Sequence, residues 1–253
     1  MMKDTMRQIF VILSILATIV VNGLANALPL NGLNTGQISN RFHVYFVPAA
    51  YVFSIWGLIY LGLIIFAVYQ ALPSQRGNPR LRATGWWVCL SGVANSAWIF
   101  LWHYEQFLLT LVAMFVLLIS LIIIYLRLGI GRIKVSLIET LAVRLVFSIY
   151  LGWITVATVA NVTSVLDFIK WDRFGISPEI WMWIILAVVL IIAILMNFTR
   201  RDIAYALVIL WALAGITVRN AAIPAVVTPT WIAFGVVLFT LVMALLMRRP
   251  ARK

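Results

Sequence analysis

Cysteine, acidic residues and histidine are all scarce in this chain of 253 residues. The single cysteine, Cys89, excludes both an internal disulfide framework and a zinc site built from cysteines. Charged residues make up 10% of the sequence, against about 25% in an ordinary soluble domain. Hydrophobic residues make up 64%, against about 45–50%. This composition excludes a soluble globule and a disordered chain, and the mean hydropathy of +1.08 predicts a polytopic membrane protein.

The few titratable groups also limit the chemistry that the sequence supports. All seven acidic residues lie near or beyond the ends of the apolar runs, whereas ion-coupled carriers place charged groups at mid-membrane. This argues against coupled transport, although a facilitator for a small hydrophobic solute stays open. The two histidines, His43 and His103, are expected in solvated loops, and Cys89 has no base within sequence reach. The sequence therefore predicts no catalytic residue and no metal site, and an enzyme is the less favoured class.

Long apolar runs dominate the rest of the chain. A helix needs about 20 mostly apolar residues to cross a bilayer core. Eight runs meet or approach this length, at residues 9–28, 49–71, 85–102, 107–126, 145–165, 180–198, 203–218 and 228–247. We therefore predict an all-α integral membrane protein with eight transmembrane helices.

The basic residues sort by side of the membrane. If the N-terminus is cytoplasmic, fifteen of the 19 lysines and arginines fall in cytoplasmic segments. The four on the other side are Arg41, Lys170, Arg173 and Arg219. Such a bias is the positive-inside pattern, so we expect both termini in the cytoplasm and a prokaryotic plasma membrane as the host. The net charge of +12 is then explained by topology and by membrane lipids, including at the basic tail of residues 248–253, and no nucleic-acid partner is expected.

Several helix ends carry local signals. Ser177, Pro178 and Glu179 have the order of a cap, a first-turn proline and a first-turn acid, and Asp202 can cap the seventh run. Thr228 and Pro229 are expected to open the eighth run in the same way. Tryptophans near the run ends are expected to anchor the membrane interface. These are Trp86, Trp87, Trp102, Trp171, Trp181, Trp183 and Trp231.

The first run allows two interpretations. Basic residues precede it, and Ala25-Asn26-Ala27 resembles a signal-peptide cleavage site. Asn22 and Asn26, however, are four residues apart and share one face of a helix, as a retained span would use them. We expect the first helix to be retained, while the alternative of cleavage stays open.

Polar and aromatic residues form stripes inside three of the runs. Trp56 and Tyr60 share a face of the second run, with Tyr51 near it. The third run carries Ser91, Asn95, Trp98 and Trp102 at helical spacing, and the fifth carries Tyr150, Trp153, Ala157 and Asn161. Each stripe alone is explained by helix packing. Together they favour a pocket, because bulky indoles pack helices poorly and aromatic side chains with a few polar groups line sites for flat apolar ligands.

The same stripes carry a resemblance to a known family. The segments are FVPAAYVFSIWGLIY at residues 46–60, NSAW at 95–98 and YLGWITVATVAN at 150–161. In order and spacing they resemble motifs of the TspO/MBR family, the tryptophan-rich sensory proteins related to the translocator protein. The resemblance covers residues 1–165 and implies a five-helix bundle. Residues 166–253 are then three additional transmembrane helices with the basic tail.

The resemblance also implies a function and a site. Family members bind porphyrins and other flat hydrophobic molecules such as sterols, and they often form dimers. A hydrophobic small-molecule ligand, membrane lipids and a second copy of the chain are therefore the implied partners, and porphyrin or haem is the implied bound group. The ligand-binding residues are expected to be Tyr51, Trp56, Tyr60, Asn95, Trp98, Tyr150, Trp153 and Asn161.

The sequence departs from the family pattern in three places. Pro48-Ala49-Ala50-Tyr51 stands where the family commonly has two prolines before a tryptophan. The second run lacks the family's proline before the inner tryptophan, and Ser148-Ile149-Tyr150 replaces the usual Pro-Tyr of the fifth helix. These changes, with the additional helices, leave the ligand and the dimer surface open.

Overall fold

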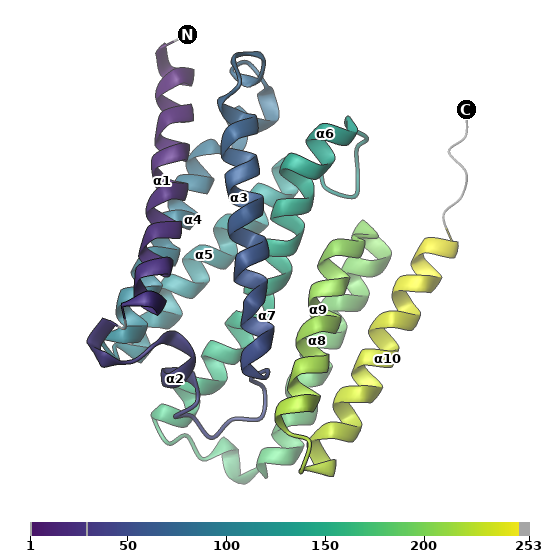
Figure 1. Ribbon diagram of the computed structural model, residues 1–253. Helices are drawn as coiled ribbons and strands as arrows, with labels where there is room; N and C mark the ends of the chain where they lie inside the picture. Colours follow the sequence, from purple (N-terminus) through teal and green to yellow (C-terminus); the bar gives the residue numbers. More distant parts are fainter. Residues whose placement is uncertain (1, 29, 248–253) are drawn as a thin grey trace.

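The computed structural model describes residues 2–28 and 30–247, and this described part is all-helical (Figure 1). The predicted basic tail, residues 248–253, lies outside it. The long helices are α1 (Met2–Ala27), α3 (Ile55–Ala71), α4 (Pro79–His103), α5 (Phe107–Arg127), α7 (Leu145–Phe168), α8 (Pro178–Arg200), α9 (Ile203–Arg219) and α10 (Pro224–Leu246). Two short helices, α2 (Thr35–Ser39) and α6 (Leu137–Glu139), lie in the connections. The prediction of an all-α membrane protein is confirmed.

Six helical segments are long and apolar enough to span a bilayer. They include the 3-10 turn at Ala50–Ser54 together with α3, and the continuous helical stretch Leu137–Phe168 that ends in α7. Helix α9 is apolar but has 17 residues, and α4 is outside the set, although it has 25 residues. Helix α4 carries buried polar residues such as Ser91 and Asn95, and these lower its mean hydropathy although the helix packs inside the bundle. The count of eight spans stays a prediction.

The first and the last long helix of the described chain run in opposite directions. In Figure 1, α1 runs downward from the top of the view, whereas α10 runs upward and ends near mid-height. An even number of crossings gives the first and last helices opposite directions, as the predicted count of eight does. The sidedness itself remains a prediction from the charge bias.

Two of the predicted helix starts are confirmed in detail. The Ser177 hydroxyl accepts a hydrogen bond from the backbone N–H of Ile180, and Pro178 is the first residue of α8. The Asp202 carboxylate accepts from the backbone N–H of Tyr205 at the start of α9, at 3.2 Å. Each cap satisfies a backbone donor that a helix start leaves without an intrahelical partner.

Two other predicted starts are wrong. Helix α10 begins at Pro224, and Pro229 lies inside it. Helix α4 begins at Pro79, six residues before the predicted run, with the Asn78 side chain accepting from the backbone N–H of Arg80. In both helices a proline occupies the first turn, where its missing N–H costs nothing, so hydropathy alone placed the starts too late. Pro229 costs one backbone hydrogen bond, which membrane helices tolerate.

Helix α1 packs closely against α4 within the bundle. A Cβ atom added to Gly92 would lie 2.2 Å from the Ser14 Oγ, so only glycine lets the two backbones approach this closely. The Thr18 hydroxyl also donates to the Ser14 carbonyl at this contact. The first apolar run is therefore a helix of the core.

The last three helices join the five-helix group mainly through α9. In Figure 1, α8, α9 and α10 lie together beside α7. A Cβ on Gly152 of α7 would lie 3.1 Å from the Val208 Cβ of α9, and a Cβ on Gly215 would lie 2.1 Å from the Val52 Cγ2. The backbone N–H of Ala49 donates to the Gly215 carbonyl at 3.0 Å. Both groups thus share one hydrophobic core.

Candidate ligand-binding site

A cavity of about 390 Å³ lies between α1, α3, α4, α5 and α7 and is covered by α2 and the 3-10 turn before α3. Its volume is within the range of about 300–1,000 Å³ that is usual for small-molecule sites. Five of the eight predicted site residues line it, namely Trp56, Tyr60, Asn95, Trp98 and Trp153. The other lining residues are Asn22, Asn26, Asn34, Thr35, Gly36, Ala50, Phe53, Ile99, Met114, Leu117, Ile154 and Ala157.

Aromatic rings form one wall of the cavity. Trp56 stacks on Tyr60 with ring centroids 5.5 Å apart and an interplanar angle of 22°. Trp153 meets Trp56 edge-on at 6.3 Å, and Phe53 meets Trp153 edge-on at 5.7 Å. Since the residues come from α3, α7 and the turn between α2 and α3, the fold brings together side chains far apart in sequence. The result is a wall suited to a flat apolar molecule.

Amide groups also line the cavity. The Asn22 side chain donates to the Asn95 Oδ1 at 2.6 Å, and the Asn95 side chain donates to the Tyr150 hydroxyl at 3.0 Å. The predicted site residue Tyr150 is buried behind this contact and does not line the cavity. Its position is that of a support for Asn95.

The predicted residue Asn161 also supports the wall from behind. The Trp98 indole N–H donates to the Asn161 Oδ1 at 3.0 Å, and the Asn161 amide donates to the Thr110 hydroxyl at 2.9 Å. Asn161 lines a smaller cavity of about 60 Å³. This second cavity shares five lining residues with the first, namely Thr35, Phe53, Trp98, Trp153 and Ala157, so the two are neighbours across one wall.

The indole N–H of Trp153 differs from the other polar groups of the site. Trp153 is 2% exposed and lines both cavities, yet its Nε1 has no hydrogen-bond partner within the described part of the chain. A buried donor without a partner is uncommon in folded proteins, because its desolvation is not compensated. The Trp153 indole N–H is therefore a buried donor that no described group satisfies.

The cover over the cavity is held by His103. The residue is the last of α4 and 1% exposed, so the expectation of a solvated loop histidine is wrong for His103. Its Nδ1 lies 3.1 Å from the Leu30 carbonyl oxygen, which can only accept, and its Nε2 lies 3.0 Å from the Thr35 hydroxyl. The neutral ring then donates from Nδ1 and accepts at Nε2. Helix α2 is thereby tied to the end of α4.

Trp102 is a second tie on the same cover, and the expectation of an interfacial anchor is wrong for it. Its side chain is buried, stacks on Trp98 with centroids 5.1 Å apart, and donates its N–H to the Thr35 carbonyl at 3.2 Å. Trp231, by contrast, is 50% exposed on α10.

The predicted residue Tyr51 lies outside the cavity. It is 46% exposed and meets Trp211 of α9 edge-on at 5.3 Å. The Trp211 indole N–H donates to the Val52 carbonyl at 3.2 Å. Tyr51 therefore belongs to the contact between α9 and the turn before α3.

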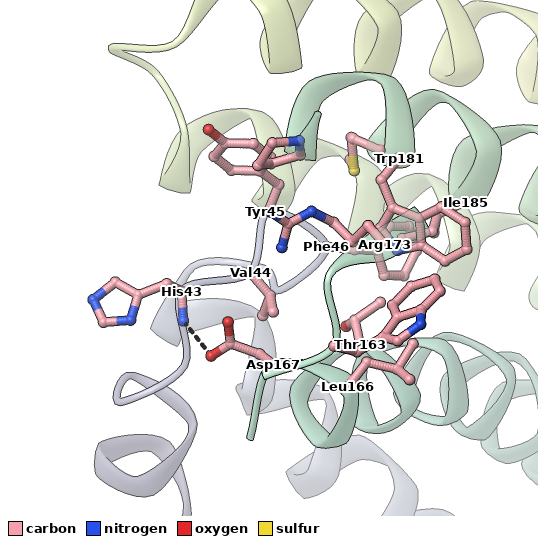
Figure 2. A pocket seen from close by; sticks show the side chains of 13 residues that line it. His43, Val44, Tyr45, Phe46, Thr163, Leu166, Asp167, Arg173, Trp181 and Ile185 are labelled. Atoms are coloured by element: carbon pink, nitrogen blue, oxygen red, sulfur yellow. Dashed lines mark hydrogen bonds between the residues drawn. The ribbon is translucent and has the colours of Figure 1, made fainter. Parts of the chain in front are cut away.

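A smaller pocket of about 50 Å³ lies where the segment before α3 meets the end of α7 and the start of α8 (Figure 2). The His43 backbone N–H donates to the Asp167 carboxylate, while the His43 ring points away from the pocket. The Tyr45 hydroxyl donates to the Glu179 carboxylate at 3.0 Å. Burial, followed by this contact, raises the pKa of Tyr45, so the phenol stays protonated as a donor. These two contacts fasten residues 43–45 to α7 of the five-helix group and to α8 of the last three helices.

The main cavity is uncharged. Among the described residues that line it, none is acidic, basic or a histidine. The described residues also contain no group of three or more histidine, cysteine, aspartate or glutamate side chains that could hold a metal. The chemistry available is stacking, apolar contact and neutral hydrogen bonding.

Sequence reasoning missed the lining residues outside the three stripes. Asn22 and Asn26 are predicted to share one face of the first helix, but the predicted site does not include them. Phe53 lies within the motif at residues 46–60, where the change from a 3-10 turn to α3 alters which side chains face inward. For α2 a local signal is present, since Asn34 and Gln37 form a capping box.

Comparison with known proteins identifies the family of the chain. A model of the family described as TSPO-like protein matches residues 8–244, so the match runs from α1 into α10. No curated protein and no solved structure matches the sequence. The matched region contains all three motifs and every described residue that lines the cavity. The chain therefore belongs to the family of TSPO-like proteins, the TspO/MBR family that its motifs resemble.

Proposed function

We propose that this membrane protein is a ligand-binding, sensory protein that holds a flat, mostly hydrophobic molecule in the cavity among α1, α3, α4, α5 and α7. The observation that carries the proposal is the aromatic cavity of about 390 Å³, which gathers Trp56, Trp98 and Trp153 from three helices. Indole rings stack on flat ligands, and the neighbouring amides supply neutral hydrogen bonds that orient them. Membership of the TSPO-like family supports the same class of function.

The resemblance suggests a tetrapyrrole or a sterol-like molecule as the ligand. The flat tetrapyrrole ring suits the stacked tryptophans. Haem iron would find neither histidine nor cysteine among the described lining residues, although these are common haem ligands. Met114 and Tyr60 do line the cavity, and both residue types ligate haem iron in other proteins, so the lining offers a tetrapyrrole ring stacking as well as two side chains of iron-ligating type. Transport of such a ligand across the bilayer would also require the cavity to open to each side in turn, and none of the described contacts specifically supports such a change.

The proposal is tested by titrating the purified protein in neutral detergent with protoporphyrin IX and, separately, with a fluorescent sterol. Saturable binding is read from ligand absorbance or fluorescence. Trp153→Phe removes the indole N–H, and Asn95→Leu removes the amide at nearly constant volume. Each is expected to weaken binding several-fold, since an ordinary hydrogen bond contributes about 0.5–1.5 kcal/mol.

Trp231→Phe is the matched control, because Trp231 is an exposed tryptophan of α10 outside the cavity. It is expected to bind like wild type. Absence of saturable binding for both ligand classes, or equal binding by all three variants, would contradict the proposal.

A further inference from the structure

We propose that the pocket of Figure 2 is a second binding site, for a small zwitterionic group that joins an ammonium to a phosphate. This pocket shares no lining residue with the aromatic cavity, so the site is independent of the function proposed for that cavity. Its volume of about 50 Å³ exceeds several-fold the ~10–15 Å³ that one water molecule needs. It can hold the ammonium end of such a group, but not a tetrapyrrole or a sterol.

Two opposite charges line the pocket without being paired to each other. Figure 2 shows both among the lining side chains: Asp167, near the end of α7, and Arg173, in the connection to α8. The Asp167 carboxylate accepts from the His43 backbone N–H, and the Arg173 Nε donates to the Ile176 carbonyl at 3.2 Å. Neither residue takes part in the ion pairs found within the described chain. A ligand that carries both charges would give each of them an ionic partner.

Aromatic rings in the lining favour an ammonium group near the carboxylate. Trp171 and Trp181 meet edge-on with ring centroids 4.9 Å apart, and Tyr45 and Phe46 line the same pocket. The faces of such rings attract ammonium groups, most strongly those of tryptophan. We therefore assign the ammonium to the aromatic rings together with Asp167.

The guanidinium of Arg173 fits the other half of the ligand. Its planar fork matches the oxygens of a phosphate, to which it can donate two parallel hydrogen bonds. Glu179 lies beyond ion-pair distance of Arg173, and its carboxylate already accepts from the Tyr45 hydroxyl at 3.0 Å. A ligand with one charge fits less well, because a lone cation would meet Arg173 and a lone anion would meet Asp167.

The pocket lies at the depth of lipid headgroups. It is formed where two segments that are long and apolar enough to span a bilayer end and begin, Leu137–Phe168 and Pro178–Arg200. Exposed apolar side chains surround this connection in sequence: Phe174 is 81% exposed, Ile180 57% and Trp183 50%. Such side chains are typical of a membrane interface. The headgroup of phosphatidylethanolamine and free phosphoethanolamine are two sources of the proposed chemistry.

Two lipids with identical acyl chains test the site. Phosphatidylethanolamine carries both charges, whereas phosphatidylglycerol carries the phosphate without the ammonium. Each is titrated into the purified full-length protein in neutral detergent, and binding is read from the rise in melting temperature. We expect phosphatidylethanolamine to bind about tenfold more tightly than phosphatidylglycerol. Free phosphoethanolamine, titrated without lipid, distinguishes the sources: a saturable rise assigns the site to the soluble ester as well, and no rise assigns it to the lipid alone.

Charge-removing variants connect the preference to the pocket. Asp167→Asn keeps an oxygen that can accept from the His43 N–H but loses the negative charge, so it should abolish the preference for phosphatidylethanolamine. Asp172→Asn is the matched control, because it loses the same charge in the same connection, keeps an acceptor for the Phe174 N–H and does not line the pocket. It should keep the preference. Arg173→Gln should weaken the binding of both lipids several-fold.

The outcomes are separate from those that test the aromatic cavity. Equal binding of the two lipids by wild type, or the same preference in Asp167→Asn and Asp172→Asn, would overturn the second site. None of these variants alters a residue that lines the aromatic cavity, so binding of protoporphyrin IX or a sterol there should not change.

Discussion

Asn95 joins three helices through one side chain. Its Oδ1 accepts from Asn22 of α1, its amide donates to Tyr150 of α7, and the residue itself lies on α4. All three side chains are buried, so each depends on the others for hydrogen bonding. In a membrane such contacts replace hydration that hydrocarbon cannot supply.

We predict that Asn95→Leu lowers the free energy of unfolding by about 1–3 kcal/mol, because it leaves two buried polar groups with one partner fewer. Tyr150→Phe removes one bond and should cost about 0.6 kcal/mol, the average for interhelical hydrogen bonds in membranes. Equilibrium denaturation in mixed micelles measures both values. Equal stability of Asn95→Leu and wild type would contradict the role given to this residue.

Much of the site could be predicted from residue spacing. Trp56, Tyr60, Asn95, Trp98 and Trp153 lie on regular α-helices, where positions three or four apart share a face. Tyr51 does not follow this rule, because it lies in a 3-10 turn whose side-chain directions differ from those of α3. The unused donor of Trp153 could not be predicted, since it depends on which partners the folded neighbours fail to supply.

Helix α2 and the end of α4 act together as a cover. His103 donates to the Leu30 carbonyl and contacts the Thr35 hydroxyl, so one imidazole holds the segment at two points. This attachment could not be predicted from the sequence, because a histidine after an apolar run is usually solvated. In this fold His103 is buried by contacts with residues distant in sequence, and a local sequence pattern does not contain them.

We predict that His103→Ala loosens the cover without unfolding the bundle. Amide hydrogen exchange should rise for residues 30–40, and the ligand should dissociate several-fold faster. His43→Ala is the matched control, because His43 is exposed and its ring points away from the neighbouring pocket (Figure 2). Unchanged exchange in residues 30–40 of His103→Ala would show that other contacts hold the cover.

At the scale of the whole molecule, α9 connects the last three helices to the 3-10 turn before α3, which covers part of the cavity. Gly215 packs against the Val52 side chain, and its carbonyl accepts a hydrogen bond from the backbone N–H of Ala49. Ala50, the residue after Ala49, lines the cavity. The last three helices are predicted as an addition to a five-helix bundle. In the structure, the contacts of α9 also hold the segment that covers the site. The pattern of residues within a single helix cannot indicate such a contact between distant segments.

We predict that Gly215→Val lowers stability by about 1–3 kcal/mol, because its side chain would overlap Val52. Ligand affinity should also fall, although Gly215 does not line the cavity. Gly235→Val is the control, since a Cβ there meets no atom within 4 Å. Thermal denaturation with and without ligand measures both effects. If Gly215→Val and Gly235→Val have the same stability and the same ligand affinity, the proposed coupling between α9 and the cavity is contradicted.

The predicted orientation in the membrane is based on the charge bias of the sequence and not on the geometry of the bundle. After Cys89→Ser, a single cysteine at Arg132 should be protected from an impermeant maleimide in intact cells, whereas one at Asp172 should be labelled. These positions lie in connections at opposite ends of the bundle, one after α5 and one after α7. Labelling at position 132 in intact cells would reverse the predicted topology.

The central claim is that a flat ligand occupies the cavity between the helices, and blocking that cavity tests it most directly. Ala157→Phe adds a ring where Ala157 lines both neighbouring cavities. Titration of wild type and variant with the same neutral ligand should give saturable binding in wild type and a loss of at least tenfold in the variant, with helix content and melting behaviour retained. Equal affinity in a folded Ala157→Phe protein would place the ligand elsewhere and contradict the account.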